Sequence, residues 1–563
     1  MRKIYQVCLA LLLGCCLEVA ANGQSFRVQC PTSTITHPVR TGGNTNLPAN
    51  NNSEPAYTVP TTLAPNSSGY LAPTSHVNGA IKCQQISGGD GFATMGDGTQ
   101  TYMFSFGPLS GLADIAAGRP GTEFPNVFNT IYTGAPLQPG DPATTDDPNA
   151  AGPPIAVTGQ PFTYNGAIGL ATDVFTNPVT GNPTTANDGH VDPRPIEDVG
   201  VMNGNIPAPL MALDEDDEFF LTLTNVGMIM RPDLFEQHTV HFHGYPNASA
   251  FYDGVPDASV AINIGGSFTY YYLAPDAGTY FWHCHITPPE HLQMGMVGQI
   301  YVRPRQDRVP TGTHLYAALQ QQQNDLRTKC DSATDILCSN PLPAAGDNGT
   351  TGGFANGTAS KLFAYNDGDG STAYDVEYPI QIHGFDPNFH FVGMTFNPEG
   401  FSDMKDKYFL LNGRSYPDTI MPGPLETQST DGANHFAQPL PSLINIQAGK
   451  KALLRISDLD VTEFQTLASL GIPMEVIAIN AKLLRDQAGH NLYYNTNSIT
   501  LGGGESLDVI LDATNYTAPN TFYLYTPNLD HLSNDAENFG GLMTEVHICA
   551  SVNPVTKVGT GCN

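Results

Sequence analysis

Two short segments of the chain contain residues whose types and spacing fit a metal site. Residues 238–244 hold three histidines, and residues 283–296 hold three histidines, one cysteine and two methionines. Imidazole nitrogen, thiolate sulfur and thioether sulfur are ligands that zinc and copper take in proteins. The two segments together therefore indicate metal chemistry.

The spacing of the inner histidines predicts two faces on extended strands. Alternate side chains of a strand point to the same side, so His241 and His243 share one face. For the same reason His283 and His285 share a face, and Cys284 between them points the opposite way. A strand with this pattern can contact one metal site on each of its two sides.

The side that Cys284 faces can form a type 1 (blue) copper site. His238 falls on the face opposite the first histidine pair, so its imidazole can meet the thiolate. Two imidazoles, one thiolate and a weak thioether form the blue-copper ligand set, which soft sulfur and trigonal geometry select. His291 and Met296 on the following loop complete this set. Met294 is the alternative axial residue, but the spacing to His291 favours Met296.

The remaining histidines of the two segments suit a second copper group, because imidazole nitrogen is a borderline-soft ligand. These residues are His241, His243, His283 and His285. Zinc is the alternative metal, but a zinc site rarely uses a cysteine between two histidines that face the other way. We expect His283, Cys284 and His285 to connect the blue copper with the second group.

Both segments resemble the His-x-x-His-x-His-Gly and His-Cys-His…His…Gly-Met motifs of the multicopper oxidases, a family of the cupredoxin superfamily. Asp-Gly-Val-Pro at 253–256 also resembles a loop of that family's first domain. The resemblance covers residues 99–305 and 361–550. It implies copper as the cofactor, a phenol or a metal ion as the electron donor, and dioxygen as the acceptor. It also implies the type 1 ligands His238, Cys284, His291 and Met296, and the type 2 and type 3 ligands His241, His243, His283 and His285.

Two features depart from the family's pattern. His291 lies seven residues after Cys284 instead of five, which we interpret as a two-residue loop insertion that leaves ligation intact. The family also builds a trinuclear cluster with a second set of His-x-His pairs, and this chain has none. Residues 465–471 and 525–527 stand at the corresponding places. We therefore expect a homo-oligomer in which a neighbouring subunit completes the cluster.

Strands must position these residues. The chain has 57 glycines and 45 prolines among 563 residues, only 13% charged residues, and short alternating segments between turns. This composition is typical of all-β sandwiches or barrels. A weak internal repeat predicts two tandem cupredoxin-like Greek-key domains with long loop insertions. The paired segments are 203–209 with 412–417, 218–225 with 451–457, 264–268 with 501–505, and 278–282 with 520–524.

The N-terminal residues predict export. Arg2 and Lys3, an apolar run and the small residues at 19–21 are typical of a signal peptide, and the run is too short to span a bilayer. Residues 12–15 alternatively resemble a lipoprotein box, which would place a lipid anchor on Cys15. On either interpretation we expect the protein in the periplasm, on the outer membrane surface or outside the cell.

The predicted order along the chain follows from these segments and from shifts in composition. It is a signal peptide (1–21), a polar extension (22–98), a copper-bearing domain (99–305) with an insertion at about 118–197, a linker (306–360), a second domain without a copper motif (361–550) and a tail (551–563). The long extension and insertion are similar to those of bacterial members of the family.

Six cysteines remain after removal of the signal peptide, besides Cys284 in the metal motif. An even number in an oxidising compartment favours three disulfide bonds. The sequence does not fix the connectivity. Proximity along the chain favours Cys30–Cys83, Cys330–Cys338 and Cys549–Cys562.

A net charge of −30 argues against a nucleic-acid partner, because such a surface repels phosphate and attracts cations. Glu236 and Glu290 lie close in sequence to His238 and His291, and the latter is expected to approach the surface. We predict that these carboxylates dock a divalent cation such as Fe(II) or Mn(II) as the donor. Ordinary solvated surface acids are the alternative.

Our functional hypothesis is an exported copper-dependent oxidase that passes electrons from a donor through type 1 copper to a type 2/3 group and dioxygen. A blue-copper electron carrier or copper-binding protein is the alternative. A nitrite-reductase-like enzyme is a further one, although that family has Asp where His241 stands. The other histidines show no ligand spacing and are expected to be structural: His37, His76, His190, His314, His383, His390, His435, His490, His531 and His547.

Overall fold

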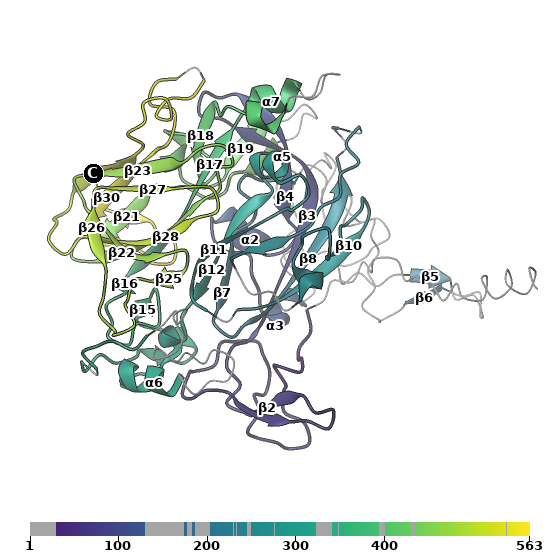
Figure 1. Cartoon of the computed structure of the whole chain (residues 1–563), viewed down its shortest axis with the longest axis vertical. Coiled ribbons are helices and arrows are strands. Elements are labelled where there is room, and N and C mark those ends of the chain that lie inside the picture. Colours follow the sequence, from purple (N-terminus) through teal and green to yellow (C-terminus); the bar gives the residue numbers. More distant parts are fainter. Residues whose placement is uncertain are drawn as a thin grey trace, which may run out of the picture.

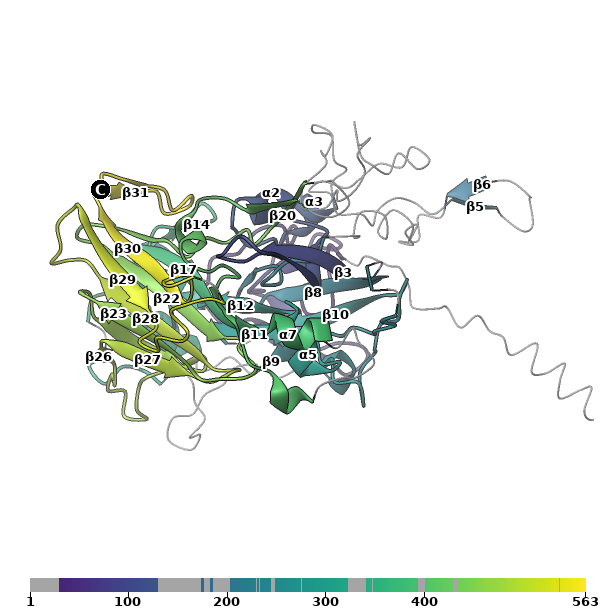
Figure 2. The same ribbon diagram turned by 90° about the horizontal axis from the view of Figure 1, so that it is seen from above.

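The computed structural model describes residues 30–129, 174–176, 183–185, 203–322, 341–392, 400–428 and 434–562, apart from 229, 232, 245–248, 275, 347 and 536. These residues form mostly strands, in two sandwiches that lie side by side (Figures 1 and 2). The predicted all-β class with two tandem sandwiches is therefore confirmed. No helix of the described segments is long and apolar enough to cross a membrane. The predicted signal peptide, Cys15, the Cys330–Cys338 pair and most of the insertion lie outside these residues.

The first sandwich consists of two four-stranded sheets. The strand order of one sheet is β10 (Ser267–Leu273), β8 (Glu218–Gly227), β3 (Ile81–Thr94) and β4 (Gln100–Pro108). The order of the other is β7 (Met211–Asp214), β12 (Val297–Arg303), β11 (Gly278–His283) and β9 (His241–His243). Trp282 of β11 lies in the core between them and stacks on Phe106, with 5.2 Å between ring centroids. Cys284 shares this core, so it points to the interior as the alternation predicts.

The second sandwich has a seven-stranded and a five-stranded sheet. The larger sheet has the order β18 (Tyr408–Leu411), β17 (Val376–Phe385), β22 (Lys451–Asp458), β28 (Ser506–Asp512), β24 (Met474–Ile479) and β25 (Lys482–Leu483), with β26 (Tyr494–Thr496) also paired to β24. The smaller sheet has the order β21 (Ile444–Gln447), β30 (Met543–Cys549), β29 (Asn520–Tyr525), β23 (Gln465–Leu470) and β27 (Ser498–Leu501). Aliphatic side chains of both sheets form the core.

The two sandwiches repeat one topology. In the first, β3 runs parallel to β8 and β7 runs parallel to β12; in the second, β17 runs parallel to β22 and β21 runs parallel to β30. The antiparallel pair β9–β11 corresponds to the pair β23–β29. This correspondence agrees with the weak internal repeat of the sequence.

Short elements surround the sandwiches. The helices are α2 (Leu112–Ala116), α3 (Pro125–Phe128), α5 (Pro288–Gln293), α6 (Leu315–Gln322) and α7 (Pro387–Val392). The two-stranded ribbons are β1 (Thr62–Pro65) with β2 (Leu71–Ser75), β5 (Val174–Thr176) with β6 (Pro183–Thr185), β13 (Phe354–Ala355) with β14 (Thr358–Ala359), β15 (Leu362–Phe363) with β16 (Ala373–Tyr374), β19 (Leu425–Gln428) with β20 (Asn434–Ala437), and β31 (Ser551–Val552) with β32 (Gly559–Thr560). Of these elements, α5 matters most for the site.

The first sandwich begins earlier than the sequence predicts. Residues 81–94, assigned to the polar extension, form β3, which lies between β8 and β4 inside the sheet. Lys82, Gln84 and Asp90 make this strand look like a surface segment, yet all three are buried. Lys82 is paired with Glu54, Asp214 and Asp217 at 2.9–3.1 Å. Because these ion pairs satisfy the Lys82 ammonium, this residue can lie in the interior of the sheet.

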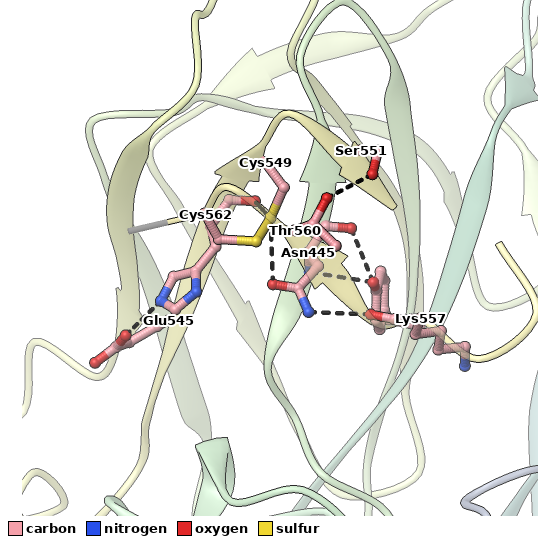
Figure 3. The surroundings of a disulfide bond; sticks show 9 residues. Asn445, Glu545, Cys549, Ser551, Lys557, Thr560 and Cys562 are labelled. Carbon is pink, nitrogen blue, oxygen red and sulfur yellow. Dashed lines mark hydrogen bonds and ion pairs between the residues drawn. A yellow bond between two sulfur atoms is a disulfide. The ribbon is translucent and has the colours of Figure 1, made fainter. Parts of the chain in front are cut away.

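Two of the three favoured disulfide bonds are confirmed, Cys30–Cys83 and Cys549–Cys562. The first ties the N-terminal extension to β3. The second, drawn in Figure 3, ties the end of the chain to β30. In the same figure Asn445 of β21 donates a hydrogen bond to the backbone carbonyl of Lys557 at 3.0 Å. The C-terminal segment therefore folds back onto the second sandwich.

The two sandwiches meet through β11 and β12 on one side and β22 and β28 on the other. Gln299 of β12 donates hydrogen bonds to the Arg455 carbonyl and the Ser457 hydroxyl, both at 2.9 Å. Thr279 of β11 donates to Asp508 of β28 at 2.5 Å. All of these side chains are buried. The strand that carries Cys284 is thus held directly against the second domain.

Candidate metal centre

The structure brings His238, Cys284 and His291 together in the interior of the first sandwich. One ligand atom from each lies within 4.8 Å of the others. Nδ1 of His291 lies 3.3 Å from Sγ of Cys284, and the two imidazole centroids are 5.4 Å apart. None of the three residues is exposed to solvent. His238 pairs with Ile262 next to β9, Cys284 follows β11, and α5 supplies His291.

The protonation states of the two imidazoles suit a copper ion. Burial lowers the pKa of His238 well below its usual range and that of His291 to about 3, so both rings are neutral at pH 7. Burial raises the pKa of the Cys284 thiol to about 11. A hydrogen bond from the Thr239 N–H to Sγ at 3.5 Å opposes this rise. Within the described residues, neither nitrogen of His238 nor Nε2 of His291 has a hydrogen-bond partner. Two buried imidazoles beside one thiol fit a copper ion, which would stabilise the thiolate.

The backbone after His291 is closed by hydrogen bonds that place both methionines near this group. The Met296 N–H donates to the His291 carbonyl at 2.9 Å, and the Cys284 N–H donates to the Met296 carbonyl at 3.0 Å. Met294 and Met296 are both buried. The backbone of Met296 is thus tied to two of the predicted ligands, which supports Met296 as the axial residue. That choice stays a prediction.

Strand β3 also belongs to this site, although no pattern in the sequence indicates it. A Cβ added at Gly88 would lie 2.8 Å from the Cδ2 atom of the His238 ring. Glycine therefore lets the imidazole pack directly against the β3 backbone. Phe106 of β4 also packs near the His238 imidazole, with 6.4 Å between the two ring centroids.

The second histidine group lies on the opposite side of β11. His241 and His243 of β9 pair in register with His283 and Phe281 of β11, and these three histidines each offer a ligand atom within 4.8 Å of the others. The His285 ring lies 5.3 Å from that of His241 and 5.6 Å from that of His283, between centroids. All four predicted histidines therefore gather on one face, with His285 at its edge.

Hydrogen bonds orient two of these rings. Nδ1 of His241 lies 2.6 Å from the Asp253 carbonyl, and Nδ1 of His283 lies 2.7 Å from the Cys284 carbonyl. A carbonyl only accepts, so both Nδ1 atoms carry the proton and leave Nε2 free for a metal. Gly254 allows this approach, because its φ is +80° and a Cβ there would lie 2.0 Å from the Val240 carbonyl. This contact gives a structural role to the Asp-Gly-Val-Pro motif.

Burial also favours the neutral form of His243 and His283. It lowers the pKa of His283 to about 3, although the hydrogen bond to the Cys284 carbonyl opposes the shift. Burial and the neighbouring His241 and His285 lower the pKa of His243. Neutral imidazoles are the form that binds a metal ion.

A cavity of about 570 Å³ adjoins this histidine face. His243, His283 and the first residues of α5 line one wall, and residues 459–464 and 502–505 of the second domain line the other. The second-domain wall includes Asp460, Glu463 and Glu505 but, among the described residues, no histidine. Sequence reasoning missed these residues. The available signal is the Gly-Gly-Gly-Glu run at 502–505, which the sequence indicates only as part of the internal repeat.

The predicted docking residues lie beside the type 1 group, but His291 is not at the surface. Oε2 of Glu236 lies 3.9 Å from Nε2 of His291, and Phe104 packs at 5.3 Å between ring centroids. The His291 ring is buried, but its Nε2 atom lies next to the Glu236 side chain, which is 33% exposed, so the ring lies just below the surface. Burial raises the pKa of Glu236. Burial and the charge of Glu236 raise the pKa of Glu290, and the charge of Arg231 opposes this rise.

Most other histidines of the described segments are paired with protein groups. His37 lies 2.8 Å from Glu218, His531 2.8 Å from both Gln465 and Glu463, and His547 2.6 Å from Glu545. None of the three metal-ligand groups found among the described residues includes them. The third group, formed by Glu54, Asp214 and Asp217, already surrounds the ammonium of Lys82.

Comparison with known proteins agrees with this geometry. Residues 185–307 match the family model described as multicopper oxidase. Laccase 1 of Metarhizium acridum is 31% identical over 135 residues, which are 24% of this chain and 20% of that protein. Multicopper oxidase MmcO of Mycobacterium tuberculosis is 31% identical over 149 residues, 24% of this chain and 27% of that protein. The match thus spans only about a fifth to a quarter of the length of these curated relatives.

A blue copper oxidase from Nitrosomonas europaea is similar in structure. It is 22% identical, and the superposition covers 61% of this chain and 77% of that one, with a TM-score of 0.39. The segment that matches the family model contains all six histidines and the cysteine of the two ligand groups. Over residues 185–307, which hold both histidine groups and Cys284, the chain therefore matches the multicopper oxidase family model.

Proposed function

We propose that the protein is a copper-dependent oxidase that takes electrons singly from a donor and delivers them to dioxygen. The observation that carries this proposal is the placement of two histidine groups on opposite sides of β11. Cys284 belongs to one group, and its neighbours His283 and His285 belong to the other. An electron carrier needs only the first group.

The residues of the chain divide the work between these groups. Copper, when bound, supplies a one-electron centre at the first group and a dioxygen-reducing centre at the second. His238, Cys284 and His291, with Met296 as the axial residue, would hold the first ion. The peptide bond between Cys284 and His283 links the two ligand sets by a few covalent bonds. The carbonyls of Asp253 and Cys284 hold two rings of the second set in the tautomer that leaves Nε2 free.

One chain supplies only part of a trinuclear cluster. The second-domain wall of the adjoining cavity offers carboxylates and glycines rather than imidazoles among the described residues. We propose that a second copy of the chain supplies the missing histidines, so that the active form is a homo-oligomer.

The donor is a phenol or a metal cation in this proposal. Glu236 and Glu290 stand beside the buried His291, so a divalent cation held by their carboxylates would lie near the first copper ligand set. Exported location is part of the same proposal, and the two disulfide bonds support it because such bonds persist in oxidising compartments.

Copper content and oxygen uptake test the proposal together. The purified full-length protein, loaded with copper, should bind more than one copper ion per chain. It should also consume dioxygen when Fe(II) or a phenol is added. One copper per chain with a blue colour and no oxygen uptake would instead identify an electron carrier. Reduction of nitrite without oxygen uptake would identify the nitrite-reductase-like alternative.

A further inference from the structure

Gln293 is the last residue of α5 and lies two residues after the predicted ligand His291. The family's pattern has a shorter segment between cysteine and histidine, and here the longer segment forms this helix. Gln293 is completely buried, although it is polar. A buried side-chain amide is stable only when its donors and acceptor are matched.

The second domain matches this amide. Nε2 of Gln293 donates to Oδ1 of Asp406 at 2.5 Å, and Oε1 accepts from the Asp386 N–H at 3.2 Å. Nε2 of His390 lies 3.0 Å from the same Oε1, and Nε2 of His383 lies 3.1 Å from the Gln293 backbone carbonyl. These four partners come from β17, α7 and the adjoining loops of the copper-free domain.

The network fixes how the amide is oriented. A backbone N–H can only donate, so the atom that faces Asp386 is the oxygen and the atom that faces Asp406 is the nitrogen. Burial lowers the pKa of His390 to about 3 and also lowers that of His383. Both rings are therefore neutral and donate through Nε2. No other orientation of the amide satisfies its three partners Asp406, Asp386 and His390.

Asp406 is itself held in place. Oγ1 of Thr462 lies 2.5 Å from Oδ2 of Asp406 and 3.0 Å from Oδ1 of Asp460. Gln465 donates to the other carboxylate oxygen of Asp460 at 2.6 Å. Gly384 permits this arrangement, because a Cβ there would lie 2.0 Å from Asp406 Oδ2 and 2.6 Å from Asp460 Oδ2. The support behind Gln293 is thus a connected polar network rather than a single contact.

We propose that Gln293 is a positioning residue, through which the copper-free domain fixes the loop that carries His291. The link is short: α5 contains both residues, and the Met296 N–H closes the loop onto the His291 carbonyl at 2.9 Å. A shift of Gln293 therefore moves His291 relative to Cys284. The second domain holds no copper motif, yet it sets the geometry of the first ligand group. The inference rests on the proposed type 1 site.

The test compares two buried glutamines that both bridge the domains. Gln293→Ala removes the bridge on the ligand loop, whereas Gln299→Ala removes the bridge from β12 to Arg455 and Ser457. Both variants should lower the melting temperature. Only Gln293→Ala should change the copper hyperfine splitting and the reduction potential of the blue site, and it should weaken copper binding about tenfold, the lower end for an outer partner of a metal ligand.

Asp406 supplies a second pair of variants if Gln293→Ala does not fold. Asp406→Ala should shift the reduction potential in the same direction by a smaller amount. Asp406→Asn keeps an oxygen acceptor for the Gln293 amide and should therefore have the wild-type potential. Equal potentials, spectra and copper affinities in the wild type, Gln293→Ala and Asp406→Ala would overturn the inference. A wild type without a blue band would instead overturn the proposed function.

Discussion

Removal of the two carboxylates beside His291 should weaken the binding of a metal-ion donor and leave the binding of a phenol unchanged. Oε2 of Glu236 lies 3.9 Å from Nε2 of His291. We take about 4 Å as the distance from a docked cation to each of the carboxylates of Glu236 and Glu290. One pair of unit charges at 4 Å in water interacts by about 1 kcal/mol, and a divalent ion doubles this value to about 2 kcal/mol. The positive charge of Arg231 and side-chain mobility reduce this interaction energy to about 1 kcal/mol per carboxylate.

The double variant Glu236→Gln, Glu290→Gln should therefore raise KM for Fe(II) or Mn(II) about thirtyfold at low salt, because 1.4 kcal/mol is a factor of ten. Oxygen uptake measured against donor concentration gives this value, and added salt should reduce the difference. Glu475→Gln, which removes a charge from β24 of the second domain, is the matched control. An equal change of KM for a neutral phenol, or no change for either donor, would refute the docking site.

The remaining predictions concern the copper ligands and acid stability. Cys284→Ser should abolish the thiolate-to-copper absorption band of the copper-loaded protein, and a retained band would contradict the assignment. Met296→Leu should keep the band and raise the reduction potential, since it removes a weak donor that favours Cu(II); the same result from Met294→Leu instead would exchange the two methionines. His390 has a pKa of about 3 in the folded chain and about 6.5 when unfolded, so the unfolded state binds more protons between these values. Stability should fall as pH decreases through this window, and a denaturation series should show a shallower fall for His390→Phe.

The sequence was sufficient to predict that Cys284 and its neighbouring histidines lie on opposite faces, because strand alternation is a local rule; that they bind copper stays a prediction. Cys284 and His283 are adjacent, so their opposite facing follows from the strand alone, and the structure places them in the core and on the outer face of β11 respectively. The Cys30–Cys83 and Cys549–Cys562 disulfide bonds could also be predicted, because each joins two cysteines that follow one another along the chain once Cys284 is set aside.

Features that depend on partners distant in sequence could not be predicted. Strand β3 appears polar until Lys82 is seen between carboxylates, two of which lie more than 130 residues further along the chain. Gln293 has no recognisable pattern, because its partner Asp406 is 113 residues away. The burial of His291 under Glu236 likewise depends on a fold that joins two separate segments.

Reoxidation of the reduced protein by dioxygen tests the central claim most directly. The copper-loaded wild type is reduced without oxygen until its blue colour disappears, and then mixed with dissolved dioxygen. If electrons pass from the Cys284 site to the histidine group across β11, the blue band should return within the turnover time in the wild type. It should stay bleached in His241→Ala and His285→Ala, which keep the Cys284 ligand set. Equal return of the band in all three proteins would contradict the claim that the second histidine group receives the electrons.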